Sequence, residues 1–347
     1  MNYNELLKET NEVYYRLQDD ISRKIYRARV MNSLTYDYSY ITEIAVDGID
    51  VLKYLRKELE PYIKDKRKII LDGAGYYGKS IKMTLRDIEF ECFSDKNAID
   101  ESLMGIPVLS RREAAKKYPE ALFVVTSLVY DKVIRMELEQ LGVKNILDFG
   151  EYLNRNSKIR ENQYYDVFKF SAHEIIADVG CFDCFSMMQY FKYANKSYNK
   201  IYSFEPEPKQ YAACRDIISH SKYENWEIYN YGVCDKTGTL CFSSNNSCTK
   251  ISDDGEIEVN VIRLDDFFKD KEIPTFIKMD IEGAELKALM GCSDIIRKYK
   301  PKLAICVYHK PEDIFEIPQY ILSLNSRYKM YLRHYCNLVN ETVLYCI

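Results

Sequence analysis

The sequence has little net charge and almost no tryptophan. Its formal net charge is −4 over 347 residues, and Trp226 is its one tryptophan. Nucleic acids are bound mainly through clustered Lys and Arg, so this balance gives no electrostatic indication of a nucleic-acid partner. No apolar run approaches the roughly 18 residues that a membrane-spanning helix needs. We therefore expect neither a nucleic-acid partner nor a membrane span.

The sequence also lacks a secretory pattern and an even set of cysteines. Residues 1–10 (MNYNELLKET) show no basic stretch followed by an apolar one, which argues against a signal peptide. The eleven cysteines are scattered and odd in number, which favours reduced thiols over a disulfide framework. We expect a cytoplasmic protein. A length of 347 residues with 47% apolar residues is enough for two domains.

The N-terminal segment, residues 1–66, is predicted to be helical. Leu6, Val13 and Leu17 recur at helical spacing, and charged residues fill the other face. We expect Pro61 to end the last helix of this segment. Its role stays open between a dimerisation hairpin, which would give a homo-oligomer, and a helical cap on the next domain.

Residues 67–150 are predicted to form a small Rossmann-like domain with a parallel sheet. An apolar strand is followed by the turn GAGYYG, in which Gly73, Gly75 and Gly78 have the order G-x-G-x-x-G. A helix follows this turn, and Asp95 comes just after the second strand. Glycines in such a turn let a ligand approach the backbone, and an acid about 20 residues further on contacts a ribose in dinucleotide-binding folds.

A second α/β domain is predicted over residues 171–347, after a polar, tyrosine-rich linker at 151–170. It is organised around residues 175–205, which read as a buried strand, a glycine turn, a helix, and a second strand ending on Glu205. The turn offers close access to the backbone, and the start of the helix offers unpaired N–H groups. This order suits a nucleoside ligand.

Four polar residues follow predicted strands of this domain: Asp178, Glu205, Asp280 and His309. The carboxyl ends of parallel strands line one crevice of an open sheet, so we expect these side chains to converge there. A carboxylate such as Glu205 accepts hydrogen bonds from both hydroxyls of a ribose. The four residues together predict a functional site at this edge.

The second domain resembles the FkbM family of S-adenosylmethionine-dependent methyltransferases, which have the class I methyltransferase fold with a mostly parallel sheet. The segment IKMDIEGAE carries the most specific part of the resemblance. In order, the matching segments are DVGCFDCFS (178–186), YSFEPEP (202–208), VIRLDDFF (261–268), IKMDIEGAE (277–285), VYHKPEDIFEIP (307–318) and LRHY with ETVLY (332–345).

The resemblance implies S-adenosylmethionine as the cofactor. The loop after the first strand would hold its methionine part, the acid after the second strand its ribose, and a later segment its adenine. Asp280 would face the sulfonium and the substrate. The cofactor-binding residues so implied are Asp178, Gly180, Cys181, Phe182, Glu205, Pro206, Val233, Asp235 and Asp280.

One position departs from the family pattern, because Cys184 stands where a second glycine is usual. A side chain there would weaken cofactor binding if it crowded the cofactor, and is a mild change if φ is negative. Cys184 also forms a C-x-x-C pair with Cys181 at the start of a helix, where a thiolate is favoured, so a redox site competes with the methyltransferase reading. One such pair supplies only two zinc ligands, and we predict no metal.

The predicted chemistry is methyl transfer to a hydroxyl, which needs a base to take the hydroxyl proton. His309 is the first candidate, because histidine titrates near neutral pH. Asp280 is the second candidate, as base or orienting group, and strand alternation puts Lys278 on the same side. We therefore predict His309, Asp280 and Lys278 as catalytic residues.

The first α/β domain resembles the small Rossmann-like domain at the N-terminus of bacterial sugar acetyltransferases, through IILDGAGYYGKSI, CFSDKNAID and GIPVLS. The implied ligand is a nucleotide-sugar; NAD binding and an empty assembly scaffold stay open. The residues of this second predicted site are Gly73, Gly75, Tyr76, Tyr77, Gly78 and Asp95.

The whole sequence is thus interpreted as a two-domain α/β methyltransferase that modifies a sugar or glycan precursor. Another small natural product as acceptor stays open. So do an NAD-dependent oxidoreductase and a non-catalytic nucleotide-sugar-binding or assembly module.

Overall fold

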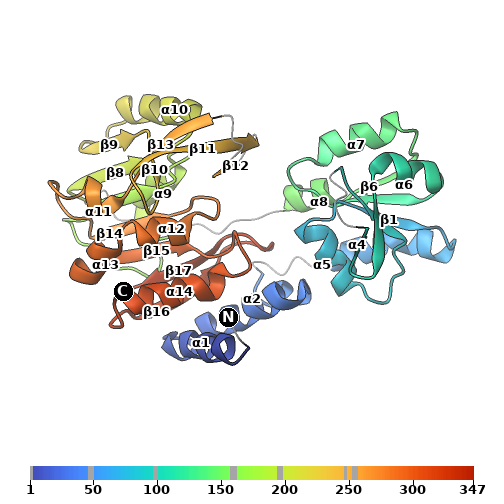
Figure 1. Ribbon diagram of the computed structural model, residues 1–347, viewed down its shortest axis with the longest axis horizontal. Coiled ribbons are helices and arrows are strands. Elements are labelled where there is room, and N and C mark those ends of the chain that lie inside the picture. The colour runs from blue at the N-terminus through green and yellow to red at the C-terminus, as the bar shows by residue number, and fades with distance from the viewer. Residues whose placement is uncertain are drawn as a thin grey trace. The chain divides into compact units, whose positions relative to one another are not determined.

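The computed structural model of this protein divides into two compact units, which we call the large unit and the small unit (Figure 1). The large unit comprises Met1–Val30, Arg160–Tyr335 and Val339–Ile347, and the small unit comprises Met31–Ile159 and Cys336–Leu338. The structure describes residues 3–45, 51–96, 101–156, 162–193, 198–245, 248–251 and 257–347. No helix in these ranges is both long and apolar enough to cross a membrane.

The large unit is built on a seven-stranded sheet with the order β16-β17-β15-β14-β7-β8-β9. β17 runs antiparallel to both of its neighbours, and the other pairs are parallel. The strands are β7 Ile175–Val179, β8 Lys200–Phe204, β9 Trp226–Tyr229, β14 Phe276–Met279, β15 Lys302–Cys306, β16 Met330–His334 and β17 Thr342–Cys346. The mostly parallel sheet confirms the predicted α/β class.

The centre of this sheet is formed by β7 and β14, whose residues are all buried. Both are short and mainly apolar, as a parallel strand covered on both faces requires, and each carries one charged residue, Asp178 on β7 and Lys278 on β14. The helices that follow the strands are α9 Phe185–Tyr193, α10 Pro208–Ser219, α11 Leu264–Phe267, α12 Glu285–Met290, α13 Ser293–Tyr299 and α14 Asp313–Leu324. Glu207 caps α10 by accepting a hydrogen bond from the Gln210 N–H at 2.7 Å.

A smaller sheet with the order β10-β13-β11-β12 lies within the same unit. Its strands are β10 Gly232–Val233, β11 Gly238–Asn245, β12 Cys248–Ile251 and β13 Ile257–Ile262. The pairing of β11 with β13 is antiparallel. The pairing of β16 with β17 in the large sheet is antiparallel too.

The small unit has a six-stranded sheet with the order β3-β4-β2-β1-β5-β6. Its strands are β1 Ile69–Asp72, β2 Cys92–Ser94, β3 Ser102–Leu103, β4 Ile106–Leu109, β5 Leu122–Val125 and β6 Asn145–Asp148. Its helices include α5 Tyr76–Thr84, α6 Arg111–Lys117, α7 Asp131–Gln140 and α8 Phe149–Asn156. All pairs except β3 with β4 are parallel, so the unit has the Rossmann-like character that its sequence predicts.

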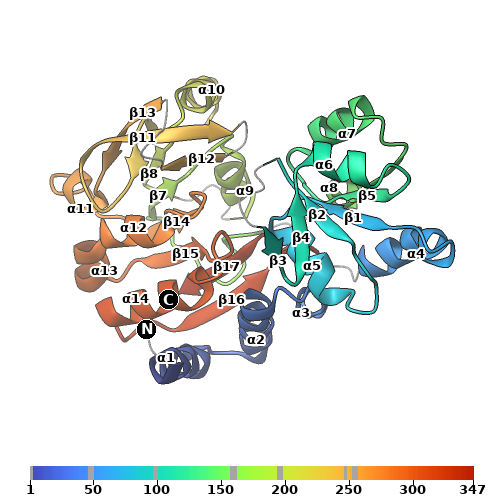
Figure 2. The ribbon, with the colours of Figure 1, turned by 45° about the vertical axis from the view of Figure 1, so that its right-hand side comes forward.

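The predicted N-terminal segment 1–66 is helical but is not one structural piece. Its helices are α1 Tyr3–Arg16, α2 Asp20–Thr35, α3 Ser39–Thr42 and α4 Val51–Lys64. Residues up to Val30 belong to the large unit, where α1 lies beside α14 (Figures 1 and 2). The expected stop at Pro61 is wrong, because α4 continues to Lys64.

The predicted linker 151–170 is partly structured. Its start lies in α8, and residues 157–161 lie outside the described residues. Tyr165 and Phe168 are buried in the core of the large unit, where their rings pack against Phe276. Aromatic side chains of this size gain too much from burial to stay in a solvated linker.

Candidate active site

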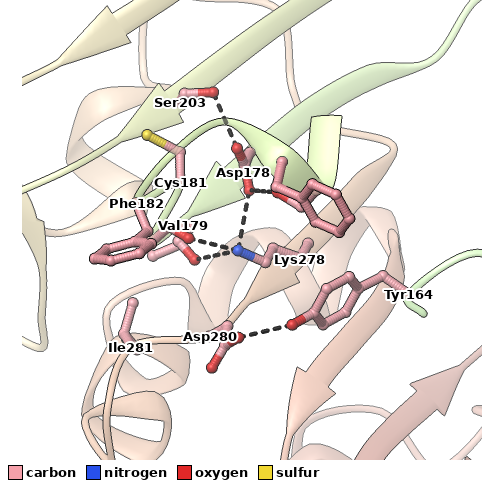
Figure 3. Close-up of polar contacts among 12 residues, drawn as sticks. Tyr164, Asp178, Val179, Cys181, Phe182, Ser203, Lys278, Asp280 and Ile281 are labelled. Atoms are coloured by element: carbon pink, nitrogen blue, oxygen red, sulfur yellow. Dashed lines mark hydrogen bonds and ion pairs between the residues drawn. The ribbon is translucent and has the colours of Figure 1, made fainter. Parts of the chain in front are cut away.

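Strand register aligns three polar residues across the middle of the large sheet. Asp178 on β7 is paired with Lys278 on β14 and with Ser203 on β8. The Lys278 Nζ lies 3.2 Å from Asp178 Oδ1, and the Ser203 hydroxyl donates to Asp178 Oδ2 at 3.1 Å (Figure 3). Trp226 Nε1 in turn donates to the Ser203 hydroxyl. The chain of contacts satisfies a buried ion pair, which would otherwise be costly.

Lys278 holds the loop that follows β7. Its Nζ donates to the Gly180 carbonyl at 2.5 Å, and the side chain is buried. Burial acts to lower the pKa of Lys278, but the charges of Asp178 and Asp280 outweigh it and raise the pKa above its ordinary value. A lysine that stays protonated is no base, and these contacts give Lys278 a positioning role; its predicted catalytic role stays a prediction.

The loop after β7 has an unusual backbone. Gly180, Phe182 and Cys184 all have positive φ, at +77°, +49° and +64°. A Cβ at position 180 would come within 2.0 Å of the Asp280 carbonyl oxygen, so this loop and the one after β14 touch backbone to backbone. Non-glycine residues in this region store strain, which is typical of functional sites. The sequence analysis called a cysteine at position 184 a mild change if φ there were negative. Because φ is positive, that condition is not met.

Glu205, at the end of β8, closes this loop from the other side. Its Oε2 accepts a hydrogen bond from the Phe182 N–H at 3.0 Å, and its Oε1 accepts one from the Glu207 N–H at 3.0 Å. Burial raises the pKa of Glu205 to about 7, and these two bonds oppose the shift. The sequence analysis missed Asn230, whose side-chain amide donates to the carbonyls of Glu205 and Pro206.

Asp280 follows β14 and accepts hydrogen bonds from two tyrosines that the sequence analysis missed. Tyr164 donates to Oδ2 at 2.7 Å (Figure 3). Tyr308 donates to Oδ1 at 3.3 Å. Burial acts to raise the pKa of Asp280, but Lys278 and His309 outweigh it and lower the pKa. Asp280 is thus a carboxylate at neutral pH and a weak base.

His309 follows β15 and lies among carboxylates. Its Nε2 is 3.5 Å from Asp280 Oδ1 and 3.8 Å from Glu282 Oε2, and its Nδ1 is 2.9 Å from Glu285 Oε1. Burial acts to lower the pKa of His309, but Glu285, Asp280 and Glu282 raise it to about 9. The imidazole is therefore protonated at neutral pH, and its neutral form is a stronger base than an ordinary histidine.

Two side chains of this cluster have unused hydrogen-bonding capacity. Among the described residues, the two ring nitrogens of His309 have no partner at hydrogen-bonding angles. The same is true of Glu285 Oε2. Glu341, just before β17, is a further carboxyl group near this cluster. Burial and the Asp280 charge raise its pKa to about 7. Buried polar groups are normally satisfied, so this cluster is ready to accept polar groups of a ligand.

The predicted adenine-binding residues lie on the smaller sheet. Val233 ends β10, and the Cys234 thiol donates to Asp235 Oδ1 at 3.1 Å. Arg263 donates to the Asp235 carbonyl oxygen. These contacts hold the segment in place, and its part in adenine binding stays a prediction.

In the small unit, the predicted second site has the form of a tightly packed turn. Gly73 has a φ of +112°, and a Cβ on Gly78 would come within 2.0 Å of the Gly73 carbonyl oxygen. Asp95 Oδ2 accepts a hydrogen bond from the Ala74 N–H at 2.9 Å. The glycines and Asp95 therefore have structural roles that account for their spacing.

The aromatic residues of that turn face other parts of the small unit. The Tyr76 hydroxyl donates to Asn32 Oδ1 at 2.7 Å, and its ring lies 5.9 Å from that of Tyr36. Tyr77 packs edge-on against Tyr76, and Gly75 is the N-cap of α5. Stacking of Tyr76 on a base would require these contacts to change. Ligand binding at this turn stays a prediction.

Two groups of three side chains bring potential metal ligands together. The ligand atoms of Cys181, Cys184 and Cys214 lie within 4.8 Å of one another. The same holds for Asp280, Glu285 and His309. The sequence analysis identified neither group in full, because one member of each, Cys214 and His309, comes from a separate segment of the chain.

The fold and the site together define a methyltransferase-like α/β enzyme. A solved structure of a methyltransferase FkbM from Methylobacillus flagellatus superposes with a TM-score of 0.51, at 18% identity, over 94% of this chain and 99% of that one. An rRNA methylase from Streptococcus thermophilus (TM-score 0.34, 15% identity) overlaps 51% of this chain and 86% of its own. A SAM-dependent methyltransferase from Aquifex aeolicus (TM-score 0.29, 12% identity) overlaps 50% of this chain and 81% of its own. No curated protein matches the chain.

Residues 174–328 match the family model described as the methyltransferase FkbM domain. The large unit therefore contains an FkbM methyltransferase domain, which confirms the resemblance; the match spans five of the six sequence segments and ends before the sixth, at 332–345. The match covers the strands β7, β8 and β14 and the loops with Glu205, Asp280 and His309. The resemblance of the small unit to the sugar acetyltransferase domain has no such match and stays a prediction.

Proposed function

We propose that this methyltransferase transfers a methyl group from S-adenosylmethionine to a hydroxyl of a sugar or glycan precursor. The observation that carries the proposal is the position of His309, between the carboxylates of Asp280 and Glu285. These residues follow or begin elements at the carboxyl edge of the central parallel strands, where ligands bind in open α/β sheets. The edge thus combines a basic group with an anionic surface.

The residues around the loop after β7 fit the cofactor. Bound S-adenosylmethionine supplies an activated methyl group on a positively charged sulfonium. Glu205 is a buried carboxylate whose oxygens each accept one backbone hydrogen bond and keep a free lone pair for a ribose hydroxyl. Asp280, ionised at neutral pH, favours a cation nearby. Gly180 allows the loop after β7 to pack directly against the Asp280 backbone, because a Cβ there would clash with the Asp280 carbonyl oxygen.

His309 is the proposed base. Glu285 contacts Nδ1, which leaves Nε2 on the side of Asp280 to take the hydroxyl proton. The Glu285 carboxylate lies 2.9 Å from Nδ1 and stabilises the protonated imidazole by its charge, and a small rotation to hydrogen-bonding angles would let it orient the ring as a buried carboxylate does in a catalytic triad. Asp280 then orients the imidazole and offsets its charge rather than accepting the proton itself.

The sugar or glycan acceptor is supported by the family resemblance and by the Rossmann-like small unit, which we propose holds a nucleotide-sugar. Methylation of another small natural product is the alternative within the same chemistry. Each of the nine cysteines whose side chains are described is a buried, free thiol, which fits the proposed cytoplasmic location.

Cofactor binding tests the proposal. S-adenosylhomocysteine, NAD and a UDP-sugar are titrated by calorimetry into the purified full-length chain. We expect S-adenosylhomocysteine to bind, and Glu205→Gln to weaken it by about 10- to 100-fold, because hydrogen bonds to a charged group contribute about 1.5–3 kcal/mol. Glu205→Gln keeps the size of the side chain and one carbonyl oxygen.

Glu227→Gln is the matched control, since Glu227 lies on the neighbouring strand β9 and is paired with Lys200. It is expected to leave the affinity unchanged. Absence of S-adenosylhomocysteine binding, with NAD or the UDP-sugar bound instead, would overturn the proposal in favour of an oxidoreductase or a nucleotide-sugar-binding module. Equal affinity in Glu205→Gln and Glu227→Gln would remove Glu205 from the cofactor site.

A further inference from the structure

Three buried cysteines meet directly under the loop that follows β7. Cys181 and Cys184 come from the loop itself, and Cys214 comes from the middle of α10. Their exposed fractions are 2%, 0% and 0%. The three Sγ atoms lie within 4.8 Å of one another, and those of Cys181 and Cys214 are 3.9 Å apart. The fold thus adds a third thiol to the C-x-x-C pair that the sequence shows.

The spacing of these sulfurs is that of a metal–thiolate site. With metal–sulfur bonds of about 2.3 Å, two thiolates on one ion are separated by about 3.8 Å in tetrahedral geometry and by about 4.0 Å in trigonal geometry. The Cys181–Cys214 separation of 3.9 Å already has this value. The Cys184 Sγ needs to move by less than about 1 Å to reach the same separation from the other two sulfurs.

The backbone of Cys184 argues against simple core packing. Free cysteines often fill cores as small apolar side chains, and such packing needs no particular residue. Cys184 instead has a φ of +64°, at which a side chain is strained and glycine is favoured. With this backbone conformation its Sγ lies in the cluster with those of Cys181 and Cys214. A specific role for the thiol explains why a strained cysteine occupies this position.

We propose that Cys181, Cys184 and Cys214 form a three-thiolate site for a thiophilic cation, Zn²⁺ or Cu⁺. Three sulfurs with no nitrogen or carboxylate among them select these soft or borderline ions over Mg²⁺, Ca²⁺ and Mn²⁺. The bound ion would link the loop after β7 to α10. Glu205 holds the same loop through the Phe182 N–H, so the ion would fix the loop in the form that we propose binds the cofactor.

The ion has a short path to the site. The Cys214 thiol donates to the Phe182 carbonyl at 2.8 Å, so the segment Cys181–Cys184 covers the cluster. The Phe182 side chain is 50% exposed, which places the outer side of this segment at the surface. Opening a single loop is therefore enough for entry, as a site that loads after folding requires.

Metal binding tests the proposal on the full-length, reduced protein. Zn²⁺ and Cu⁺ are each titrated in competition with a chromogenic chelator, and Co²⁺ is used as a probe because thiolate ligation gives an intense near-ultraviolet charge-transfer band. We expect one equivalent of Zn²⁺ or Cu⁺ to bind, and the charge-transfer band to appear with Co²⁺. The two titrations distinguish which ion is preferred.

Cys184→Gly is the decisive variant, because it removes a thiol and also relieves the strained φ. We expect it to stay folded, with equal or higher thermal stability without metal, and to bind at least about 100-fold more weakly. Cys214→Ala is a second variant with the same expected loss. Cys292→Ala is the matched control, since Cys292 is a buried free thiol on the same unit but outside the cluster.

No stoichiometric binding of either ion by the wild-type protein would overturn the proposal. So would wild-type affinity in Cys184→Gly, or an equal loss in Cys292→Ala. These readouts do not involve methyl transfer, so they are independent of the proposed activity.

Discussion

At the scale of single residues, His309 decides how the proposed activity depends on pH. Its pKa is raised to about 9, because the attraction of Glu285, Asp280 and Glu282 exceeds the effect of burial. A base acts only in its neutral form, which below pH 9 grows about tenfold with each pH unit. The proposed activity therefore increases with pH over the neutral range.

We expect kcat/KM for methyl transfer to rise with a slope of about one and to level off near pH 9. Glu285→Gln removes the nearest carboxylate, so the pKa of His309 falls toward its ordinary value of 6.5 and the bend in the profile moves to lower pH. The plateau is expected to fall by about tenfold, since the weaker base and its loss of orientation both slow the reaction. The pH profile of the purified variants measures both effects.

Glu282→Gln is the control for this prediction. Glu282 lies 3.8 Å from Nε2 and is 39% exposed, so water screens its charge and the shift is expected to be smaller than for Glu285→Gln. A wild-type profile that is flat between pH 6 and 9, or an unmoved bend in Glu285→Gln, would exclude His309 as the base.

The sequence predicted the central site residues because they lie at or near the ends of strands. Glu205 and Asp280 directly follow β8 and β14, Asp178 is the last residue but one of β7, and His309 comes three residues after β15. Tyr164 was missed because it lies in the segment interpreted as a linker, far from Asp280 along the chain. Glu285 belongs to the most specific motif, but its contact with His309 depends on how the loop after β14 turns.

At the scale of elements, the contact between the loops after β7 and β14 decides the shape of the cofactor edge. Gly180 has a φ of +77°, and a Cβ there would overlap the Asp280 carbonyl oxygen and approach Ile281 Cγ2 to 2.8 Å. The Asp280 backbone directly follows the central strand β14, so it cannot move away without disturbing the sheet. One methyl group at this position therefore separates the two loops.

We expect Gly180→Ala to lower the free energy of unfolding by about 2–4 kcal/mol, the sum of backbone strain and overpacking. Binding of S-adenosylhomocysteine is expected to weaken by at least about tenfold, because Glu205 and Asp280 would no longer face the same space. Thermal unfolding and calorimetry measure the two effects.

Gly105→Ala separates the two causes. Gly105 has a similar φ of +80°, but no atom lies within 4 Å of a Cβ at that position. It is expected to show the strain alone, about 1 kcal/mol, with normal cofactor affinity. If both variants lost the same stability and both bound normally, the close contact with Asp280 would have no part in shaping the site.

Element types were predictable, whereas several ends were not. The parallel strands were found because buried apolar runs of four or five residues are distinctive. Helix ends are less certain from sequence: the residue pattern favours helix starts at Glu282 and Pro318, whereas α12 begins at Glu285 and α14 at Asp313. A positive φ of +57° at Glu282 delays the first, and packing of the apolar face overrides the proline in the second.

At the scale of the whole molecule, the N-terminal helices complete the sheet of the large unit. β16 is an edge strand, and exposed edges invite pairing with other chains. The Gln18 N–H donates to the Met330 carbonyl at 3.0 Å, and Leu17 forms a parallel bridge with Met330. The Asp19 carboxylate accepts from Arg333 at 2.7 Å. The start of the chain thus covers the sheet edge formed near its end.

This arrangement was beyond sequence reasoning. The apolar faces of α1 and α2 show that these helices pack against something, but periodicity does not say against what. The sequence analysis therefore kept residues 1–66 as one segment. In the structure, the residues up to Val30 belong to the large unit and contact β16 and the residues near it. Contacts between residues some 310 positions apart depend on the complete fold.

Ser22 is the most buried polar link at this edge and carries the last prediction. Its hydroxyl accepts a hydrogen bond from the Leu332 N–H at 2.9 Å and another from Arg333 at 3.1 Å, and it is fully buried. Ser22→Ala leaves the Leu332 N–H unpaired away from water, which costs about 1–3 kcal/mol. We expect the unfolding transition of the large unit to fall by roughly 2–10 °C.

Ser219→Ala is the control, because Ser219 is exposed on α10 and its hydroxyl contacts only nearby residues of the same segment, the Asp216 carbonyl at 2.9 Å and His220 Nδ1 at 3.2 Å. A change below about 0.5 kcal/mol is expected there. If Ser22→Ala also left the transition in place, the first helices would not stabilise the sheet. A loss confined to Ser22→Ala means instead that the N-terminal residues belong to the folding unit of the methyltransferase domain, although the family match begins only at residue 174.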